Sequence, residues 1–231
     1  MSTTVRTEGD LGVASLLRDA GVVPVVVVSS GEEALRLADA LADGGLTSME
    51  VTFRSAAAAE GIRTVADQRP GFVVGAGTLL TPGDVERAVE AGARFGVSPA
   101  TDEEVLAHAA SQGLDMVPGA ATASEIARAR GLGAEVVKLF PAEVVGGVGL
   151  IDALAGPYPG LQLMPTGGIR AADLPRYLER PQVLACGGTW IAPRDLLAAG
   201  DFAEITRRAA EAAALVRSHR EHSRKEHHHG A

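Results

Sequence analysis

The stretch Val22-Val-Pro-Val-Val-Val-Val28 is the first of eight short apolar runs in the chain. The other seven follow at intervals of about 20 to 26 residues and span residues 48–53, 72–74, 95–98, 115–117, 135–139, 161–164 and 183–186. Short aliphatic runs of this kind are typical of parallel strands that are covered by helices on both faces. The pattern therefore predicts eight buried strands.

Amphipathic stretches with helix start and stop signals lie between these runs. The start signals are Thr81-Pro82, Thr101, and the capping-box pair Thr122 and Glu125. Helices are expected to end at Gly44, Gly92, Gly113 and Gly131. Eight strand-then-helix units in about 200 residues predict an α/β protein that folds as a single-domain (β/α)8 TIM barrel. A doubly wound sheet is the alternative.

The two ends of the chain differ from the body. Residues 1–9 are expected to form a flexible arm, residues 10–218 the barrel domain, and residues 219–231 a disordered His-rich tail. A helix over Leu11–Ala20 is expected to close the bottom of the barrel. All histidines but His108 lie in the tail, so no metal site built on histidine is expected in the body.

Composition excludes several classes of function. The net charge is -8, with 21 basic against 29 acidic side chains, so we expect no nucleic-acid partner. No apolar run approaches the roughly 20 residues of a membrane span, and the chain starts without a charged-then-apolar leader. We therefore expect a cytoplasmic protein with no membrane partner. The single cysteine, Cys186, is expected to pack in the core rather than react.

Lys138 is unusual in this chain. Only two lysines, Lys138 and Lys225, occur among the 21 basic residues, and the others are arginine. Lys225 lies in the polar tail, whereas Lys138 lies in the apolar run Glu135–Pro141, where a buried charge is costly. Arginine has not replaced lysine at this position, which indicates that an amine is needed there.

Polar residues at the carboxyl ends of barrel strands point into the mouth of the barrel. Lys138 and Glu50 both stand at such ends, and a lysine with a carboxylate is the minimal set for Schiff-base chemistry. Burial in apolar surroundings lowers the pKa of a lysine and so supplies the neutral amine that attacks a carbonyl. Glu50 would then move the protons. The alternative is that the two residues form a buried structural ion pair.

Two glycine pairs follow the last two predicted strands, which is where many TIM barrels bind phosphate. Small residues let backbone N–H groups approach an anion. The predicted phosphate site consists of Gly167, Gly168, Gly187, Gly188 and the hydroxyl of Thr189. The alternative is that the glycines mark tight turns.

Five motifs in this chain resemble those of the family of 2-keto-3-deoxy-6-phosphogluconate (KDPG) and 4-hydroxy-2-oxoglutarate (KHG) aldolases. They are Met49–Arg54 (MEVTFR), Gly75–Thr78 (GAGT), Val137–Glu143 (VKLFPAE), Pro165–Ile169 (PTGGI) and Gly187–Trp190 (GGTW). They stand in the family's order between about Leu11 and Leu215. Together the five motifs are specific for this family.

The resemblance implies a class I aldolase that needs no metal and no cofactor, and that is usually a homotrimer. Its expected reaction splits KDPG into pyruvate and glyceraldehyde 3-phosphate. KHG, which gives pyruvate and glyoxylate, is a further expected substrate. Lys138 falls on the family's Schiff-base lysine and Glu50 on its acid/base residue. Arg54 and Thr78 fall on positions that bind the pyruvate carboxylate. The remaining expected pocket residues are Thr52, Pro99 and Phe140.

Two other functions stay open at this point. One is the related aldolase that acts on 2-keto-3-deoxy-6-phosphogalactonate, whose substrate differs from KDPG at one carbon. The other is a catalytically silent barrel that binds a sugar phosphate. Thr52 and Arg54 favour the gluconate enzyme, and the Lys138–Glu50 pair argues against a silent barrel.

Overall fold

The computed structural model describes residues 12–229, so the expected arm at residues 1–9 lies outside the described part of the chain. The strands are β1 (Val22–Val26), β2 (Ser48–Thr52), β3 (Val73–Gly77), β4 (Gly96–Val97), β5 (Met116–Val117), β6 (Gly119–Ala120), β7 (Lys138–Leu139) and β8 (Cys186–Gly188). The helices are α1 (Val13–Ala20), α2 (Gly31–Asp43), α3 (Ala58–Gln68), α4 (Pro82–Glu90), α5 (Glu103–Ser111), α6 (Ala123–Gly131), α7 (Gly147–Ala155), α8 (Leu174–Leu178), α9 (Arg194–Ala199) and α10 (Phe202–His229). A 3-10 turn, η1 (Ala171–Asp173), precedes α8.

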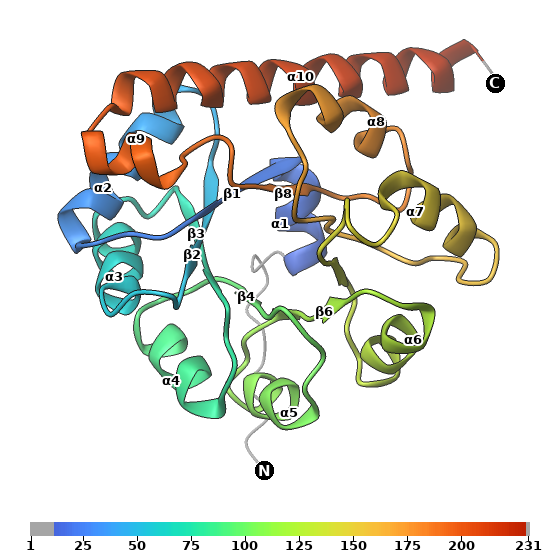
Figure 1. Ribbon diagram of the computed structural model, residues 1–231, viewed down its shortest axis with the longest axis horizontal. Helices are drawn as coiled ribbons and strands as arrows, with labels where there is room; N and C mark the ends of the chain where they lie inside the picture. The colour runs from blue at the N-terminus through green and yellow to red at the C-terminus, as the bar shows by residue number, and fades with distance from the viewer. Residues whose placement is uncertain (1–11, 230–231) are drawn as a thin grey trace.

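The strands form a parallel ring with helices around it (Figure 1). Six strands pair in the order β5-β4-β3-β2-β1-β8, and β6 pairs with β7. The chain passes from β5 to β6 across Pro118 alone. Residues 161–166 fill the gap between β7 and β8 through the parallel bridges Val137↔Leu163, Leu163↔Val183 and Thr166↔Gly187. The ring confirms the TIM barrel and excludes the doubly wound sheet.

Two prolines explain why parts of the ring are irregular. The run predicted as a strand at residues 161–164 does lie in the ring, but it is held by single bridges rather than by a regular ladder. Proline has no N–H to donate to a neighbouring strand. Pro165 follows this run directly, and Pro118 divides what would otherwise be one strand into β5 and β6.

Helix α1 closes the amino-terminal end of the barrel, as expected. Its buried side chains, Val13, Ala14 and Leu17, belong to a cluster that also contains residues from inside the ring: Val23, Phe95, Val97, Val117, Val136, Met164, Leu184 and Ala185. The backbone N–H of Val13 also donates to the Asp115 carboxylate at 3.1 Å. A ligand site is therefore expected at the opposite end of the barrel, where the strands have their carboxyl ends.

The outer helices begin and end close to the predicted signals. Capping boxes form at Thr81 with Asp84 and at Thr122 with Glu125. The start predicted at Thr101 lies one residue later, because the Asp102 carboxylate accepts the N–H of Val105 as the helix cap. Thr101 instead donates its hydroxyl to the carbonyl of Gly119 at 2.9 Å.

Helix α10 extends past residue 218, where the barrel domain is expected to end. Residues 219–229 continue this helix, where the sequence predicts a disordered tail that starts at residue 219. Glycine and proline are absent between Phe202 and His229, so nothing in the sequence stops the helix before Gly230. Arg220 also ties the helix to the end of α1, because its guanidinium donates to the carbonyls of Arg18 and Asp19 at 2.6 and 2.8 Å.

Within residues 12–229, none of the helices combines the length and the apolar character that a membrane span requires. Cys186 is fully buried at the start of β8, as expected for a core side chain. Burial raises the pKa of its thiol above the usual range, which keeps the sulfur protonated and unreactive.

Candidate active site

Lys138 and Glu50 meet inside the barrel although they lie on different strands. Lys138 begins β7 and Glu50 is the middle residue of β2, and the two side chains are 7% and 0% exposed. Lys138 Nζ lies 3.4 Å from Glu50 Oε1. The pairing that the sequence predicts from two separate motifs is therefore present in the structure.

A glycine on the neighbouring strand β3 makes room for the Glu50 carboxylate. Glu50 pairs with Gly75 on β3, and Lys138 pairs with Gly119 on β6. A Cβ added at Gly77 would lie 2.1 Å from Glu50 Oε1. Any side chain at residue 77 would therefore occupy the space that the carboxylate fills, which explains the glycine in the GAGT motif.

The contact between Lys138 and Glu50 is longer than a well-formed ion pair. A well-formed N–H···O bond between charged groups is about 2.7 to 2.9 Å long, and the separation here is 3.4 Å. The second carboxylate oxygen, Glu50 Oε2, is buried and has no hydrogen-bond partner among the described residues. Leaving a buried carboxylate oxygen without a hydrogen-bond partner costs free energy.

Phe140 and Gly167 connect the lysine to the first glycine pair. Lys138 Nζ lies 5.3 Å from the centre of the Phe140 ring. A Cβ added at Gly167 would lie 3.4 Å from Phe140 and 3.1 Å from Pro141, so this glycine packs directly on the loop that follows β7. Gly167 has a φ of 103°, which favours glycine.

Three further residues that the sequence predicts for the pocket lie at the ends of β2 and β3. Thr52 is buried and donates its hydroxyl to the carbonyl of Val26 on β1 at 2.9 Å. Thr78 follows β3 with a φ of 61°, an unusual value for a β-branched residue and one that often marks a functional position. Arg54 is exposed in the turn after β2 and forms no ion pair with any of the residues 12–229.

Pro99 follows β4 and is partly buried. Its carbonyl group packs against Gly119, because a Cβ added there would lie 2.1 Å from the Pro99 oxygen. Gly119 is also the partner of Lys138 in the ladder between β6 and β7. Pro99 therefore lies beside Gly119, the residue that pairs with Lys138 on the neighbouring strand.

The second glycine pair packs against side chains that the sequence does not single out as its partners. A Cβ added at Gly187 would lie 2.2 Å from Thr166 Oγ1, and one added at Gly188 would lie 2.2 Å from the Trp190 ring. Both glycines are buried, whereas Thr189 is exposed. The need for glycine at residues 187 and 188 therefore has a packing cause in addition to any role in binding an anion.

Glu143 is the residue at this end of the barrel whose contacts the sequence does not predict. In the sequence it stands out only as the last residue of the VKLFPAE motif. Its carboxylate accepts hydrogen bonds from Arg176 and from the hydroxyl of Tyr177, both on α8. A carboxylate so close to the lysine in the same motif is the signal that could have drawn attention to it.

The family model for KDPG and KHG aldolases matches residues 13–208 of this chain. The chain belongs to this family. A relative from Treponema pallidum named 2-dehydro-3-deoxy-phosphogluconate aldolase is 46% identical over 185 residues, which cover 80% of this chain and 88% of the relative. The KHG/KDPG aldolase of Escherichia coli K12 is 42% identical over 198 residues, covering 86% of this chain and 93% of that protein.

Solved structures of the family share the fold. The KDPG aldolase of Legionella pneumophila, with pyruvate captured as a covalent carbinolamine intermediate, superimposes with a TM-score of 0.82 and 34% identity over 85% of this chain and 96% of that one. Among residues 12–229, no group of three or more histidine, cysteine, aspartate or glutamate side chains is placed to hold a metal ion.

Proposed function

We propose that this aldolase cleaves KDPG to pyruvate and glyceraldehyde 3-phosphate through a Schiff base on Lys138. The observation that carries the proposal is the buried amine 3.4 Å from a carboxylate whose other oxygen has no partner among the described residues. Family membership supports the aldol chemistry, and the relatives named for phosphogluconate support the substrate.

Glu50 carries the protons in this mechanism. The Lys138 amine attacks the C2 carbonyl of the substrate to give a carbinolamine, and loss of water gives a protonated imine. Glu50 supplies the proton for the departing water. The Glu50 carboxylate then removes the proton of the C4 hydroxyl as the C3–C4 bond breaks. The bonding electrons move into the imine to form an enamine. Protonation of the enamine and hydrolysis of the imine release pyruvate and return the free lysine.

Arg54 and Thr78 are proposed to hold the carboxylate of the substrate. The Arg54 guanidinium is exposed and has no acidic partner among the described residues, so it is available for a bidentate pair with a carboxylate. Thr78, which follows the neighbouring strand β3, would offer a hydroxyl. Thr52, Pro99 and Phe140 are proposed to form the walls of the pocket, with Phe140 next to the lysine.

The phosphate is proposed to bind at the ends of the last two strands. Gly167, Gly168 and Gly188 would present backbone N–H groups to it, and Thr189 would add a hydroxyl. Gly187, whose N–H donates to the carbonyl of Pro165 at 2.8 Å, would leave room for the anion. The exposure of Gly168 and Thr189 supports this site, because both can be reached by a ligand.

KHG is a second candidate substrate, because it shares the 2-keto acid end that Lys138 and Arg54 would bind. The Escherichia coli relative is named for both substrates. The galactonate epimer of KDPG is the competing substrate, and membership of the aldolase family argues against a silent barrel. Values of kcat/KM for KDPG, its galactonate epimer and KHG, measured on one preparation, would rank the three substrates.

A homotrimer and a cytoplasmic location are proposed on the family resemblance alone. Light scattering on the purified protein would give its mass in solution. A monomer at micromolar concentration would contradict the proposed trimer.

The Schiff base is tested by incubation with pyruvate and borohydride, followed by peptide mapping. Only an imine is reduced to a stable adduct, so the label is expected on Lys138 alone. Lys225→Arg is the matched control and should keep full labelling, whereas Lys138→Arg should lose labelling and activity together. Labelling of Lys225, or aldol cleavage by the Lys138→Arg variant, would overturn the mechanism.

A further inference from the structure

Glu143 lies in the loop that follows the lysine strand, and it joins two parts of the proposed phosphate site. Its backbone N–H donates to the carbonyl of Gly167 at 3.1 Å, and the N–H of Ala142 donates to the carbonyl of Thr166 at 2.8 Å. These two bonds fix the loop after β7 against the loop that carries Gly167 and Gly168. The two hydrogen bonds therefore fix the distance between the two loops.

The side chain of Glu143 packs directly against Gly168. A Cβ added at Gly168 would lie 2.8 Å from Glu143 Cβ and 3.0 Å from its Cγ. Gly168 also has a φ of 80°, so glycine is needed there both for conformation and for this close approach. The position of the Gly168 backbone depends directly on the position of the Glu143 side chain.

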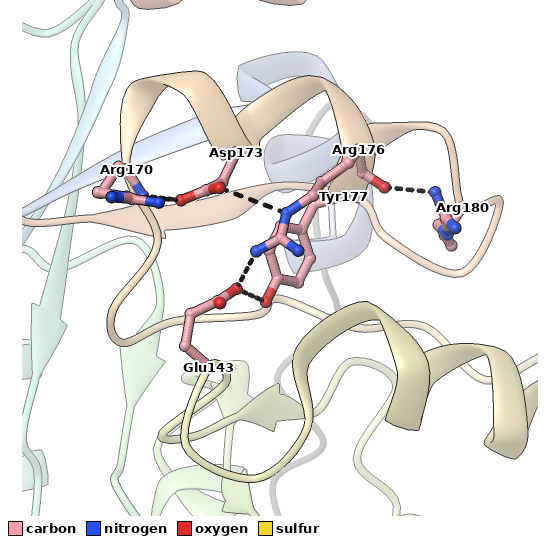
Figure 2. Close-up of polar contacts among 6 residues, drawn as sticks. All are labelled: Glu143, Arg170, Asp173, Arg176, Tyr177 and Arg180. Atoms are coloured by element: carbon pink, nitrogen blue, oxygen red, sulfur yellow. Dashed lines mark hydrogen bonds and ion pairs between the residues drawn. The ribbon is translucent and has the colours of Figure 1, made fainter.

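Helix α8 holds the Glu143 carboxylate in place, as Figure 2 shows. Arg176 Nη2 donates to Glu143 Oε1 at 2.7 Å, and the Tyr177 hydroxyl donates a short hydrogen bond to the same oxygen. Tyr177 is fully buried. Burial, and next the hydrogen bond to Glu143, raise the pKa of Tyr177, so the phenol keeps the proton that it donates.

A second carboxylate fixes the guanidinium that contacts Glu143. Asp173 Oδ1 lies 3.4 Å from Arg176 Nε, and Asp173 Oδ2 accepts hydrogen bonds from the backbone N–H and the side chain of Arg170 at 3.1 Å each (Figure 2). Burial alone would raise the pKa of Asp173, but the hydrogen bonds from Arg170 and the charge of Arg176 lower it below its usual value. Asp173 therefore stays ionised and holds Arg176 in position at neutral pH.

We propose that Glu143 is a positioning residue for the substrate phosphate, and that Arg176 and Tyr177 hold it in the arrangement that aims the Gly167–Gly168 backbone at the anion. This inference rests on the proposed function, because it concerns the same phosphate site. A free carboxylate beneath a phosphate would repel it. The guanidinium of Arg176 cancels that charge, so the carboxylate supports the loop without opposing the ligand.

The rival explanation is that Glu143 positions the lysine, because Glu143 lies in the loop that follows β7, the strand of Lys138. The two explanations differ in which ligand suffers when the carboxylate is removed. Loss of phosphate positioning affects KDPG and inorganic phosphate, whereas loss of lysine positioning affects every reaction of the imine. Exchange of the methyl protons of pyruvate needs the lysine and no phosphate, so it separates them.

The experiment compares Glu143→Ala, Arg176→Gln and Tyr177→Phe with the parent protein. We expect KM for KDPG to rise about 10- to 100-fold in Glu143→Ala, the usual cost of a small misplacement of a binding group. Inhibition by inorganic phosphate should weaken by a similar factor. Pyruvate proton exchange and borohydride labelling of Lys138 should change by less than about twofold.

Arg176→Gln keeps the inference falsifiable if Glu143→Ala does not fold, because the Arg176 side chain is half-exposed and can be replaced at the surface. Its phosphate inhibition should weaken in the same direction. Asp152→Ala is the matched control: it removes the carboxylate that pairs with Arg180 just beyond α8, and it should leave all four readouts unchanged.

Equal losses of KDPG cleavage and pyruvate exchange in the Glu143 and Arg176 variants would overturn the inference and leave the Schiff-base function intact. Unchanged phosphate inhibition in both variants would overturn it as well. A parent protein that neither exchanges pyruvate protons nor accepts the borohydride label would overturn the proposed function itself, and this inference with it.

Discussion

Glu50 offers the most direct test of the chemistry at the scale of one residue. Glutamine in its place keeps the shape of the side chain but cannot accept and return a proton. We expect Glu50→Gln to slow methyl proton exchange of pyruvate by about 10² to 10⁴, the usual range for a lost general acid or base. Proton exchange followed by NMR in deuterated water measures this effect.

Glu90→Gln is a suitable control, because Glu90 is an exposed carboxylate at the end of α4. It should exchange pyruvate protons at the parent rate. Exchange by Glu50→Gln at that same rate would show that Glu50 is not the proton carrier.

Gly188 calls for a different test from a simple substitution, because its α-carbon lies against the Trp190 ring. Gly188→Ala must displace the ring, so a loss of activity alone would not distinguish packing from phosphate binding. We expect that Gly188→Ala added to Trp190→Ala still lowers kcat/KM for KDPG but leaves pyruvate exchange at the Trp190→Ala rate. The double-mutant cycle isolates the part of the effect that the ring does not cause.

If the double variant cleaves KDPG as well as Trp190→Ala does, Gly188 serves only to accommodate the ring. Binding of the substrate phosphate would then depend less on Gly187 and Gly188 than the sequence predicts.

At the scale of single residues, the sequence predicts the pair formed by Lys138 and Glu50. It does not predict which side chains pack against the glycines of the proposed phosphate site. Lys138 and Glu50 can be found because each is a charged residue in an apolar strand, and burying a charge is costly without a reason. The contacts of Gly188 with Trp190 and of Gly168 with Glu143 depend on side chains from other loops. Spacing along the chain carries no information about such contacts.

The contact between α2 and α10 sets a limit on side-chain size at the scale of secondary-structure elements. A Cβ added at Gly44 would lie 2.4 Å from Ala209 Cβ and 2.7 Å from the carbonyl oxygen of Thr206. The helices would have to move apart, so Gly44→Ala should lower the free energy of unfolding by about 1 to 3 kcal/mol. Urea denaturation followed by circular dichroism measures this change.

Gly131→Ala is the matched control, because this glycine ends α6 and a Cβ added there would meet nothing within 4 Å. Alanine is the better helix former, so this variant should gain about 0.5 to 1 kcal/mol. Equal effects of the two substitutions would mean that α10 does not pack against α2 as described.

Elements follow from the sequence where local signals act alone. The helix start at Thr81 and the capping box of Thr122 with Glu125 are predicted correctly, because each depends on residues close together in the sequence. The irregular stretch at residues 161–166 and the continuation of α10 past residue 218 are not. The first depends on how Pro165 meets a neighbouring strand, and the second on an anchoring contact of Arg220 with α1, which is distant in sequence.

Acid should destabilise the whole molecule through carboxyl groups whose pKa is lowered by folding. They are Asp84, Glu125, Asp173 and Glu204. Hydrogen bonds from Arg207 and Arg208 lower the pKa of Glu204 to about 2, from an ordinary value of 4.5. A group with a lowered pKa stabilises the fold above its unfolded value and loses that contribution as pH falls towards its folded value.

We therefore expect a Tm that is steady from pH 7 to about pH 5 and falls between about pH 4.5 and pH 2. Differential scanning calorimetry across this range measures it. The Tm difference between the parent and Glu204→Gln should shrink over the same interval, because protonation abolishes the ion pairs that the variant already lacks. A difference that stays constant down to pH 2 would contradict this assignment.

The seam between β1 and β8 contains the chain's one thiol. Cys186 pairs with Val22 across this seam, donates its backbone N–H to the carbonyl of Gly21, and has a fully buried side chain. The Cys186 side chain packs in the core cluster that also contains residues of the outer helices, such as Tyr177 on α8 and Ala209 on α10. A maleimide or disulfide reagent can therefore reach the sulfur only when these helices separate from the strands. The rate of modification under native conditions therefore records how often the outer helices open away from the strands beside β8, without any introduced probe.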